Sequence, residues 1–189
     1  MIEWEDRSAR YNTASVCENG HLFSSCLEHE PEKKHFLFCK QCGKKLLTKC
    51  PDCGREIVGC RTVEIIPYHE DVDNSKMMVP GNLVVSIEQD SYISPSYCQY
   101  CQSAFPWTKS LLAEIDEIIS MADEFDEVDQ AILREKFPLI LLPDTPGKTV
   151  AALRISKILK TASISTASAF KSAILGKLSG EVLKIFGWI

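Results

Sequence analysis

The sequence predicts an α+β protein in which a small-β zinc-ribbon module with two zinc sites is followed by a C-terminal helical module. Three observations lead to this prediction. All nine cysteines lie within the first 101 residues. The same region alternates short strand-like runs with turns, and the hydrophobic period becomes helical afterwards. We therefore expect a double zinc-ribbon-like domain over residues 1–105 and a helical domain over residues 106–189.

The composition indicates a globular protein. Of the 189 residues, 45% are hydrophobic and 25% are charged, and the formal net charge is -5. This balance does not favour a nucleic-acid-binding protein built on bulk positive charge. The N-terminus lacks a secretory signal and no apolar run is long enough to cross a bilayer, so we expect a cytoplasmic protein. In that reducing compartment, nine cysteines indicate metal binding or catalysis rather than disulfides.

Four pairs of metal-ligating side chains follow one another along the first half. One pair flanks the turn dipeptide Asn19-Gly20, because both residues tolerate the positive φ angles of a two-residue hairpin turn. The other three pairs are CxxC motifs, two of them followed by glycine, which lets the chain turn away from a metal-bound sulfur. The eight predicted ligands are Cys17, His21, Cys39, Cys42, Cys50, Cys53, Cys98 and Cys101. Because a structural zinc site takes four ligands, they predict two Zn²⁺ ions per chain.

The spacing leaves the pairing of these motifs open. We favour a sequential scheme, in which the first two pairs share one ion and the last two pairs share the other. In a nested scheme the two middle pairs share an ion, since the seven residues between Cys42 and Cys50 can span about 23 Å. A crossed scheme is the third alternative.

Cys26 and Cys60 remain outside the four pairs. Free cysteine is among the most buried residue types, so we expect both to be small apolar side chains in the core. Cys60 follows Gly59 close to a knuckle. The alternative is therefore that Cys60, or Cys26, substitutes for one of the eight ligands.

The first half should contain short strands joined by turns. Runs rich in β-branched and aromatic residues predict strands at Leu22–Ser25, Phe36–Phe38, Val63–Ile66 and Leu83–Ile87. The polar stretch 69–82 ends in Pro-Gly-Asn and is expected to be an exposed loop.

The second half should be helical. The first helix has one apolar face and either Thr108 or Ser110 as its N-cap. The members of that face are Leu111, Leu112, Ile115, Ile118 and Ile119. A second helix is expected from about Phe125 to Phe137, with Val128, Ile132 and Leu133 facing inward.

After the second helix, the three prolines of residues 137–148 predict an extended connector. A third helix should start near Thr149 and carry the apolar residues Val150, Leu153, Ile158 and Leu159. One or two short helices should close the chain, around Ser168–Leu178 and Glu181–Phe186.

Charge is segregated in the helical half. Residues 111–137 hold nine acidic and two basic side chains, whereas residues 148–189 hold seven basic side chains and one acidic side chain. We expect the acidic and basic helices to pack on each other. The less favoured alternative is that the basic tail, residues 148–189, contacts nucleic acid or an anionic membrane.

A local basic cluster lies around the first two CxxC motifs. Its members are Lys40, Lys44, Lys45, Lys49, Arg55 and Arg61. Zinc ribbons often bind nucleic acid through such residues, but cations beside thiolates can also balance the negative field of the metal site. Both interpretations stay open.

Signals for catalysis are weak. Residues 145–149 end like a phosphate-binding loop, but Leu142 occupies the position where that motif needs its first glycine. Every ligand pair has a partner pair, so both predicted zinc sites can close and leave no coordination position for a substrate. We therefore expect a protein that is not an enzyme.

Taken in order, these motifs resemble a bacterial family known only as a domain of unknown function. The resemblance rests on YNTASVCENGH at residues 11–21, the three CxxC motifs, and FPWT at residues 105–108. The chain departs from the pattern at Gln102, where glycine is usual, and at Cys60. The family implies zinc ribbons and no reaction. We therefore expect a non-enzymatic adaptor or regulatory protein with a protein partner. The alternatives are a nucleic-acid-binding zinc-ribbon protein and an effector whose basic helical tail interacts with a membrane.

Overall fold

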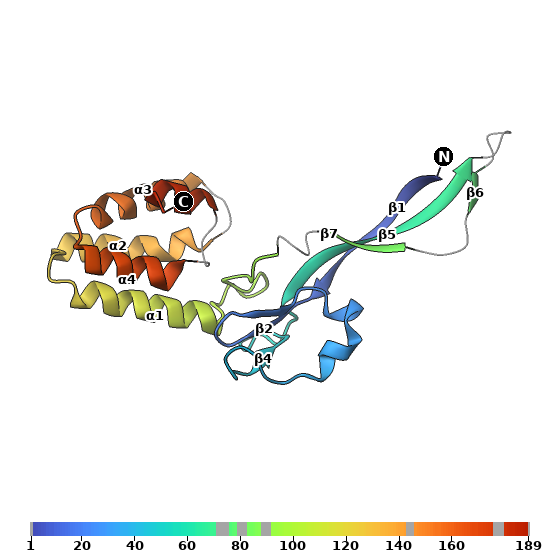
Figure 1. The fold of residues 1–189 in the computed structure, drawn as a ribbon, viewed down its shortest axis with the longest axis horizontal. Helices are drawn as coiled ribbons and strands as arrows, with labels where there is room; N and C mark the ends of the chain where they lie inside the picture. Colours follow the sequence, from blue (N-terminus) through green and yellow to red (C-terminus); the bar gives the residue numbers. More distant parts are fainter. Residues whose placement is uncertain are drawn as a thin grey trace. The chain divides into compact units, whose positions relative to one another are not determined.

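The computed structural model describes residues 2–70, 76–78, 83–87, 92–142, 146–175 and 180–188. The chain forms two compact units, Met1–Phe105 and Pro106–Ile189. Antiparallel sheets make up the first unit and helices make up the second (Figure 1). The α+β fold class predicted from the sequence is therefore confirmed.

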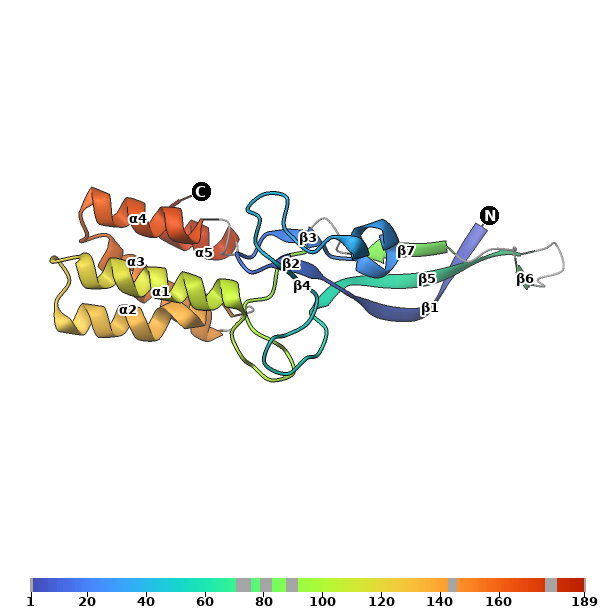
Figure 2. The same cartoon turned by 90° about the horizontal axis from the view of Figure 1, so that it is seen from below.

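A long antiparallel sheet occupies one part of the first unit. Strand β1 (Ile2–Thr13) runs beside β5 (Val58–Glu70), with Ala9 opposite Val63 (Figures 1 and 2). The other side of β5 pairs with β7 (Leu83–Ile87) and, further along, with β6 (Lys76–Met78). The central strand of this sheet is therefore β5.

A smaller sheet follows β1 directly. Its strands lie in the order β3 (Leu22–Ser24), β2 (Ser15–Cys17) and β4 (Leu46–Leu47). Two 3₁₀ turns come after β3, η1 (Leu27–His29) and η2 (Pro31–His35). The segment 24–35 is therefore compact without adding a strand.

A carboxylate in η1 binds the end of β1 in the long sheet. The side chain of Glu28 in η1 accepts hydrogen bonds from the backbone N–H of Thr13 at 2.8 and 2.9 Å and from its hydroxyl at 2.6 Å. Ala14, Val16 and Ile57 are buried at this junction. The carboxylate thus holds η1 against the end of β1.

Several sequence predictions for the first unit need correction. Strand β1 was not expected, because its sequence mixes charged and apolar residues without a clear alternation. Phe36–Phe38 is not a strand, and only Phe38 forms a bridge, with Lys45. The expected strand Val63–Ile66 is part of the longer β5, and Leu83–Ile87 is β7 as predicted.

The expected loop 69–82 is wrong in part. Residues 69 and 70 belong to β5 and residues 76–78 form β6. Hydrogen bonding to a neighbouring strand has overridden the polar composition here. Residues 71–75 and 79–82 lie outside the described residues.

The described residues of the second unit form five helices around one core. They are α1 (Pro106–Met121), α2 (Glu127–Ile140), α3 (Pro146–Leu159), α4 (Ile164–Ile174) and α5 (Gly180–Phe186). Helix α1 contacts α2 and α4, whereas α3 contacts α2 and α5 (Figure 2). Phe137 of α2 stacks on Phe170 of α4 in the core, with ring centroids 5.4 Å apart.

The predicted helices exist, but their ends differ. Neither Thr108 nor Ser110 caps α1, because the helix already begins at Pro106, a residue well suited to a first helical turn. Asp126 caps α2, and Ser163 caps α4. Helix α4 ends at Ile174 rather than near residue 178, and residues 176–179 lie outside the described residues.

The expected extended connector 137–148 is also wrong at both ends. Helix α2 continues through Pro138 to Ile140, and α3 starts at Pro146. A proline inside a helix removes a backbone hydrogen bond and usually ends the helix. In α2 only two helical residues follow Pro138, so few backbone hydrogen bonds are lost. The burial of Phe137 and Ile140 favours the extra turn. Residues 143–145 lie outside the described residues.

The predicted inward faces hold in outline. In α1, Leu111, Ile115 and Ile119 are buried as expected. Leu133 of α2 is also buried, but Val128 is 65% exposed because it lies in the first turn, on the opposite side of the helix. In α3, Ile158 and Leu159 are buried, but Val150 and Leu153 are exposed, and the core positions include Ala151, Ala152 and Ile155.

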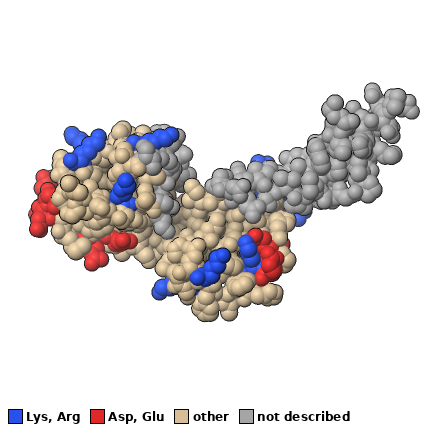
Figure 3. All heavy atoms as spheres, in the orientation of Figure 1, with Lys and Arg blue, Asp and Glu red and all other residues tan. Residues whose placement is uncertain are grey.

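Acidic and basic helices are neighbours within the second unit. On the face drawn in Figure 3, acidic side chains gather along α1 and its link to α2, whereas basic side chains lie over α3 and α4. Lys136 is the main cause that lowers the pKa of Glu135 in α2, and Arg154 of α3 contributes to the same shift.

Within the described residues, no helix combines the length and apolarity that crossing a bilayer requires.

Candidate metal centres

The three CxxC motifs adopt one backbone conformation. In each, the N–H of the first cysteine donates to the carbonyl five residues on: Cys39 to Lys44 at 2.8 Å, Cys50 to Arg55 at 2.7 Å and Cys98 to Ser103 at 2.9 Å. In each, the residue before the first cysteine forms a β-bridge that closes the knuckle. This repeated turn places both sulfur atoms of a motif on the same side of the chain.

A left-handed residue ends each of these knuckles. It is Gly43 (φ 69°), Gly54 (φ 71°) or Gln102 (φ 60°), and its N–H donates to the carbonyl of the first cysteine at 2.8–2.9 Å. Glycine adopts this conformation without a Cβ penalty. The departure from glycine at Gln102 therefore leaves the shape of the knuckle unchanged but introduces local strain.

The fourth pair lies at the tip of the hairpin between β2 and β3. The N–H of Gly20 donates to the carbonyl of Cys17 at 2.8 Å, and the N–H of Cys17 donates to the carbonyl of His21 at 3.0 Å. Within this loop only Gly20 has a positive φ angle, so the turn is longer than the predicted two-residue type. It still brings Cys17 and His21 together.

The first metal centre joins this hairpin to the first CxxC motif. The Nδ1 atom of His21 lies 3.5 Å from the sulfur of Cys17, 3.3 Å from that of Cys42 and 3.8 Å from that of Cys39. The sulfur atoms of Cys17 and Cys42 are 3.7 Å apart. Leu46 and the half-buried Phe23 pack against the group.

The second metal centre joins the other two CxxC motifs. The sulfur of Cys50 lies 3.8 Å from that of Cys101, and the sulfur of Cys53 lies 3.7 Å from that of Cys98. Across the centre, the guanidinium of Arg55 lies 4.7 Å from the centroid of the Tyr100 ring. This cation–π contact links the two knuckles outside the metal site.

The separations fit a tetrahedral ion. All ligand atoms within each group lie within 4.8 Å of one another. Ligands at Zn–S and Zn–N bond lengths in a tetrahedron are about 3.8 Å apart for two sulfurs and about 3.6 Å apart for sulfur and nitrogen. Both groups match these values. Each of the two groups can therefore hold a metal ion, and the structure groups the ligands in the sequential scheme.

Local hydrogen bonds prepare one thiolate in each centre. The backbone N–H of Gln41 is the main cause that lowers the pKa of the Cys39 thiol to about 6. The hydroxyl of Ser103, followed by its N–H, lowers the pKa of Cys101 to about 6. Burial raises the pKa of Cys17. A metal ion binds the thiolate form of cysteine. The donors Gln41 and Ser103 therefore favour the ligating form of Cys39 and Cys101 at neutral pH.

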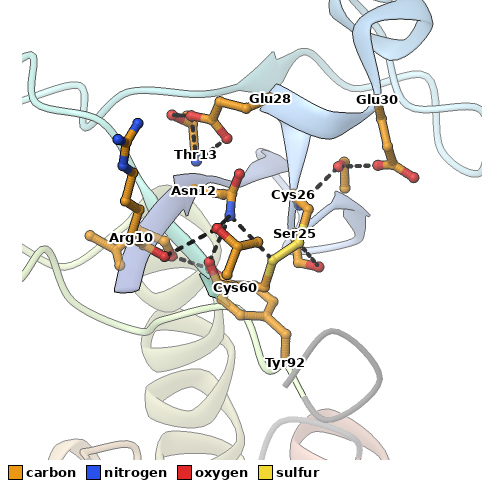
Figure 4. Close-up of a disulfide and its surroundings, with 12 residues drawn as sticks. Arg10, Asn12, Thr13, Ser25, Cys26, Glu28, Glu30, Cys60 and Tyr92 are labelled. Atoms are coloured by element: carbon orange, nitrogen blue, oxygen red, sulfur yellow. Dashed lines mark hydrogen bonds between the residues drawn. A yellow bond between two sulfur atoms is a disulfide. The ribbon is translucent and has the colours of Figure 1, made fainter. Parts of the chain in front are cut away.

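The two remaining cysteines form a disulfide, which the sequence did not predict. Cys26 follows β3, Cys60 lies in β5, and both are buried as expected (Figure 4). Neither belongs to a metal group, so the alternative of a substitute ligand is not supported. Their partnership was hidden because 34 residues separate them and no spacing motif marks a disulfide.

The residues of the basic cluster surround the first two CxxC knuckles. Lys40, Lys44, Lys45, Lys49 and Arg55 are exposed, whereas Arg61 on β5 is half-buried. Arg55 faces the ring of Tyr100. These side chains therefore do not all lie free on one surface.

The comparisons with known proteins give a family and no named function. No curated protein and no solved structure matches the chain. A family model described as "uncharacterized protein conserved in bacteria" matches residues 10–186, which includes all eight candidate ligands and most of both units. The chain therefore belongs to this family of uncharacterized bacterial proteins, DUF2321.

Proposed function

We propose that both metal centres hold Zn²⁺ and that the ions are structural. The donor sets, three thiolates with one imidazole and four thiolates, are those that zinc prefers in closed tetrahedral sites. Four protein ligands fill each centre, which leaves no position for a substrate. The β strands near the centres are short, with two residues in β4 and three in β2 and β3. Metal binding supplies the stability that such short strands lack.

We further propose that the zinc module is a non-enzymatic adaptor that binds a protein partner. The observation that carries this proposal is an apolar triplet, Phe36, Leu37 and Phe38, whose members are 58%, 66% and 62% exposed. Phe36 also contacts the half-buried ring of Phe23, with centroids 5.4 Å apart. Contiguous apolar side chains on a surface are typical of a site that another molecule covers.

The triplet is held in place rather than carried on a loose loop. The N–H of Leu46 in β4 donates to the carbonyl of Leu37 at 2.8 Å, and Phe38 is bridged to Lys45. Cys39, a ligand of the first centre, follows immediately. A preorganised apolar surface loses little entropy on binding, which favours it as an anchor for a partner.

A comparison of captured proteins tests the adaptor proposal. The tagged full chain and the variant F36S/L37S/F38S are cross-linked in lysate of the native host, and bound proteins are quantified by mass spectrometry. We expect at least one partner to fall about tenfold with the variant, while its metal content stays unchanged. As a control, Ile164→Ser changes an apolar side chain that is 90% exposed in the second unit. Equal capture by the chain and the F36S/L37S/F38S variant would contradict the proposal.

Nucleic acid is the second candidate partner. Residues 33–49 contain six lysines and no acidic residue, and exposed aromatic rings of the triplet lie among them. Lysines beside stackable rings favour binding of a single strand. Retention on single-stranded DNA or RNA should then fall with salt and be lost in K44E/K45E/K49E but not in Lys160→Glu. Retention that is absent at low salt would exclude this candidate.

Membrane binding by residues 148–189 is the least favoured candidate. Phe170 and Ile174 of α4 and Val182 of α5 are buried in the helical unit, so their apolar faces already have a partner. Flotation with anionic vesicles that depends on residues 162–189 would support it.

A further inference from the structure

The Cys26–Cys60 pair is held together by the surrounding backbone as well as by its own bond. The N–H of Cys60 donates to the carbonyl of Ser25 at 2.8 Å, and the two Cα atoms of the pair are 5.6 Å apart. The side chain of Asn12 donates to the carbonyl of Cys60 at 3.2 Å and to the hydroxyl of Thr62 at 3.1 Å (Figure 4). Backbone and side-chain hydrogen bonds, as well as the bond itself, therefore hold the two cysteines side by side.

The position of the pair in the chain relates it to both metal centres. The bond closes a loop from residue 26 to residue 60, which contains Cys39, Cys42, Cys50 and Cys53. These four cysteines are half of each centre. The remaining ligands, Cys17 with His21 and Cys98 with Cys101, lie outside the loop on either side. The disulfide thus sits at the base of the segment that both ions must hold.

We propose that Cys26 and Cys60 form a redox-responsive modification site that sets how firmly the module retains its zinc ions. The inference rests on the proposed zinc function. In the oxidising step, each thiol loses one hydrogen, a bond forms between the sulfurs, and a low-molecular-weight disulfide accepts two electrons and two protons to become two thiols. The reverse exchange restores both cysteines.

Chain entropy connects this step to metal retention. A ribbon that loses its ion becomes disordered, and the gain in conformational entropy favours the loss. Closing the loop restricts the metal-free chain much more than the folded one, where the two cysteines already meet. Oxidation should therefore slow metal release. Loop closure over 34 residues is large enough to account for about a tenfold change.

The redox state of the pair can be counted directly. The zinc-loaded full chain is equilibrated with mixtures of oxidised and reduced glutathione, then denatured with chelator and N-ethylmaleimide and weighed by mass spectrometry. We expect the nine cysteines to take nine labels in the reducing mixture. In the oxidising mixture they should take seven, with Cys26 and Cys60 unlabelled.

Zinc release to excess chelator is then timed in both mixtures. We expect release from the oxidised chain to be about tenfold slower than from the reduced chain. In the matched variant C26S/C60S, release should occur at the rate of the reduced chain in both mixtures. The release rates of the unaltered chain in the two mixtures test the inference by themselves, so the test does not depend on whether the variant folds.

Three results would overturn the inference. These are nine labels in the most oxidising mixture, fewer than seven labels because zinc ligands oxidise first, or equal release rates in both states. A chain that holds no zinc in either state would refute the zinc function itself, and the label count would still report the disulfide separately.

Discussion

Gly59 passes so close to Ser25 that no side chain fits between them. A Cβ atom on Gly59 would overlap the carbonyl oxygen of Ser25 and lie 2.8 Å from the carbonyl oxygen of Asn12 and 3.0 Å from the nitrogen of Ala14. All three obstacles are backbone atoms, which cannot turn away. The approach joins β5 to the segment after β3, one residue before the disulfide.

We therefore predict that Gly59→Ala lowers the free energy of unfolding by about 3 kcal/mol, because the added methyl group must push two backbone segments apart. The control Gly43→Ala adds the same methyl group in open space, at a φ angle of 69°. It should cost only about 1 kcal/mol. Urea unfolding followed by circular dichroism measures both. Equal costs would show that the close approach has no energetic consequence.

Gln102 supplies a reciprocal prediction. Because it is a non-glycine residue with a φ angle of 60°, Gln102→Gly should relieve strain and stabilise the first unit by about 0.5 to 1 kcal/mol. The converse variant, Gly54→Gln in the same metal centre, should destabilise it by about 1 kcal/mol. Thermal melting of the zinc-loaded protein should move in opposite directions for the two variants. A lower melting temperature for Gln102→Gly would contradict the account.

Phe170 is expected to be a main determinant of stability in the helical unit. It is fully buried and stacks on Phe137 with an interplanar angle of 6°. Phe170→Ala should cost about 3 to 5 kcal/mol, since it leaves a large cavity. Ile164→Ala in the same helix removes an exposed side chain and should change stability by less than about 0.5 kcal/mol. Unfolding monitored by helical ellipticity distinguishes the two, and similar midpoints would argue against this core.

The stability of the helical unit should depend on pH through Glu124. Its carboxylate accepts a hydrogen bond at 3.0 Å from the N–H of Ser163, the residue that caps α4, and this bond is the main cause that lowers its pKa from 4.5 to about 2. Because the pKa is lower in the folded state, the stabilisation is complete above about pH 4.5 and is lost as the pH falls towards 2.

Glu124→Gln should therefore lower the melting temperature at pH 7 and have no effect near pH 2. The neighbouring Asp123→Asn changes the same charge on an exposed residue and serves as the control. Scanning calorimetry at both pH values gives the comparison. A loss that is equal at pH 7 and pH 2 would mean that the carboxylate charge at Glu124 is not responsible.

The sequence predicted the parts of the site that depend on local spacing. CxxC motifs and the Cys17–His21 turn carry their geometry within a few residues, so the ligands were recognisable before any fold was known. Pairing between segments that lie far apart in the sequence has no local motif that would predict it. The disulfide joins Cys26 to Cys60, which lies 34 residues further along the chain. Strand β1 depends on β5, which is more distant still. Helix α2 continues beyond Pro138 because the burial of Phe137 and Ile140 outweighs the tendency of proline to end a helix.

The most direct test of the account is the metal content of the purified full chain. Elemental analysis together with native mass spectrometry should find two zinc ions per chain. Cys39→Ser, which removes a ligand of the first centre only, should leave one. Chelation should then unfold the sheets near the centres while the helical unit keeps its ellipticity. Fewer than about one metal ion per chain, or sheets that survive complete chelation unchanged, would contradict the proposed zinc-structured module.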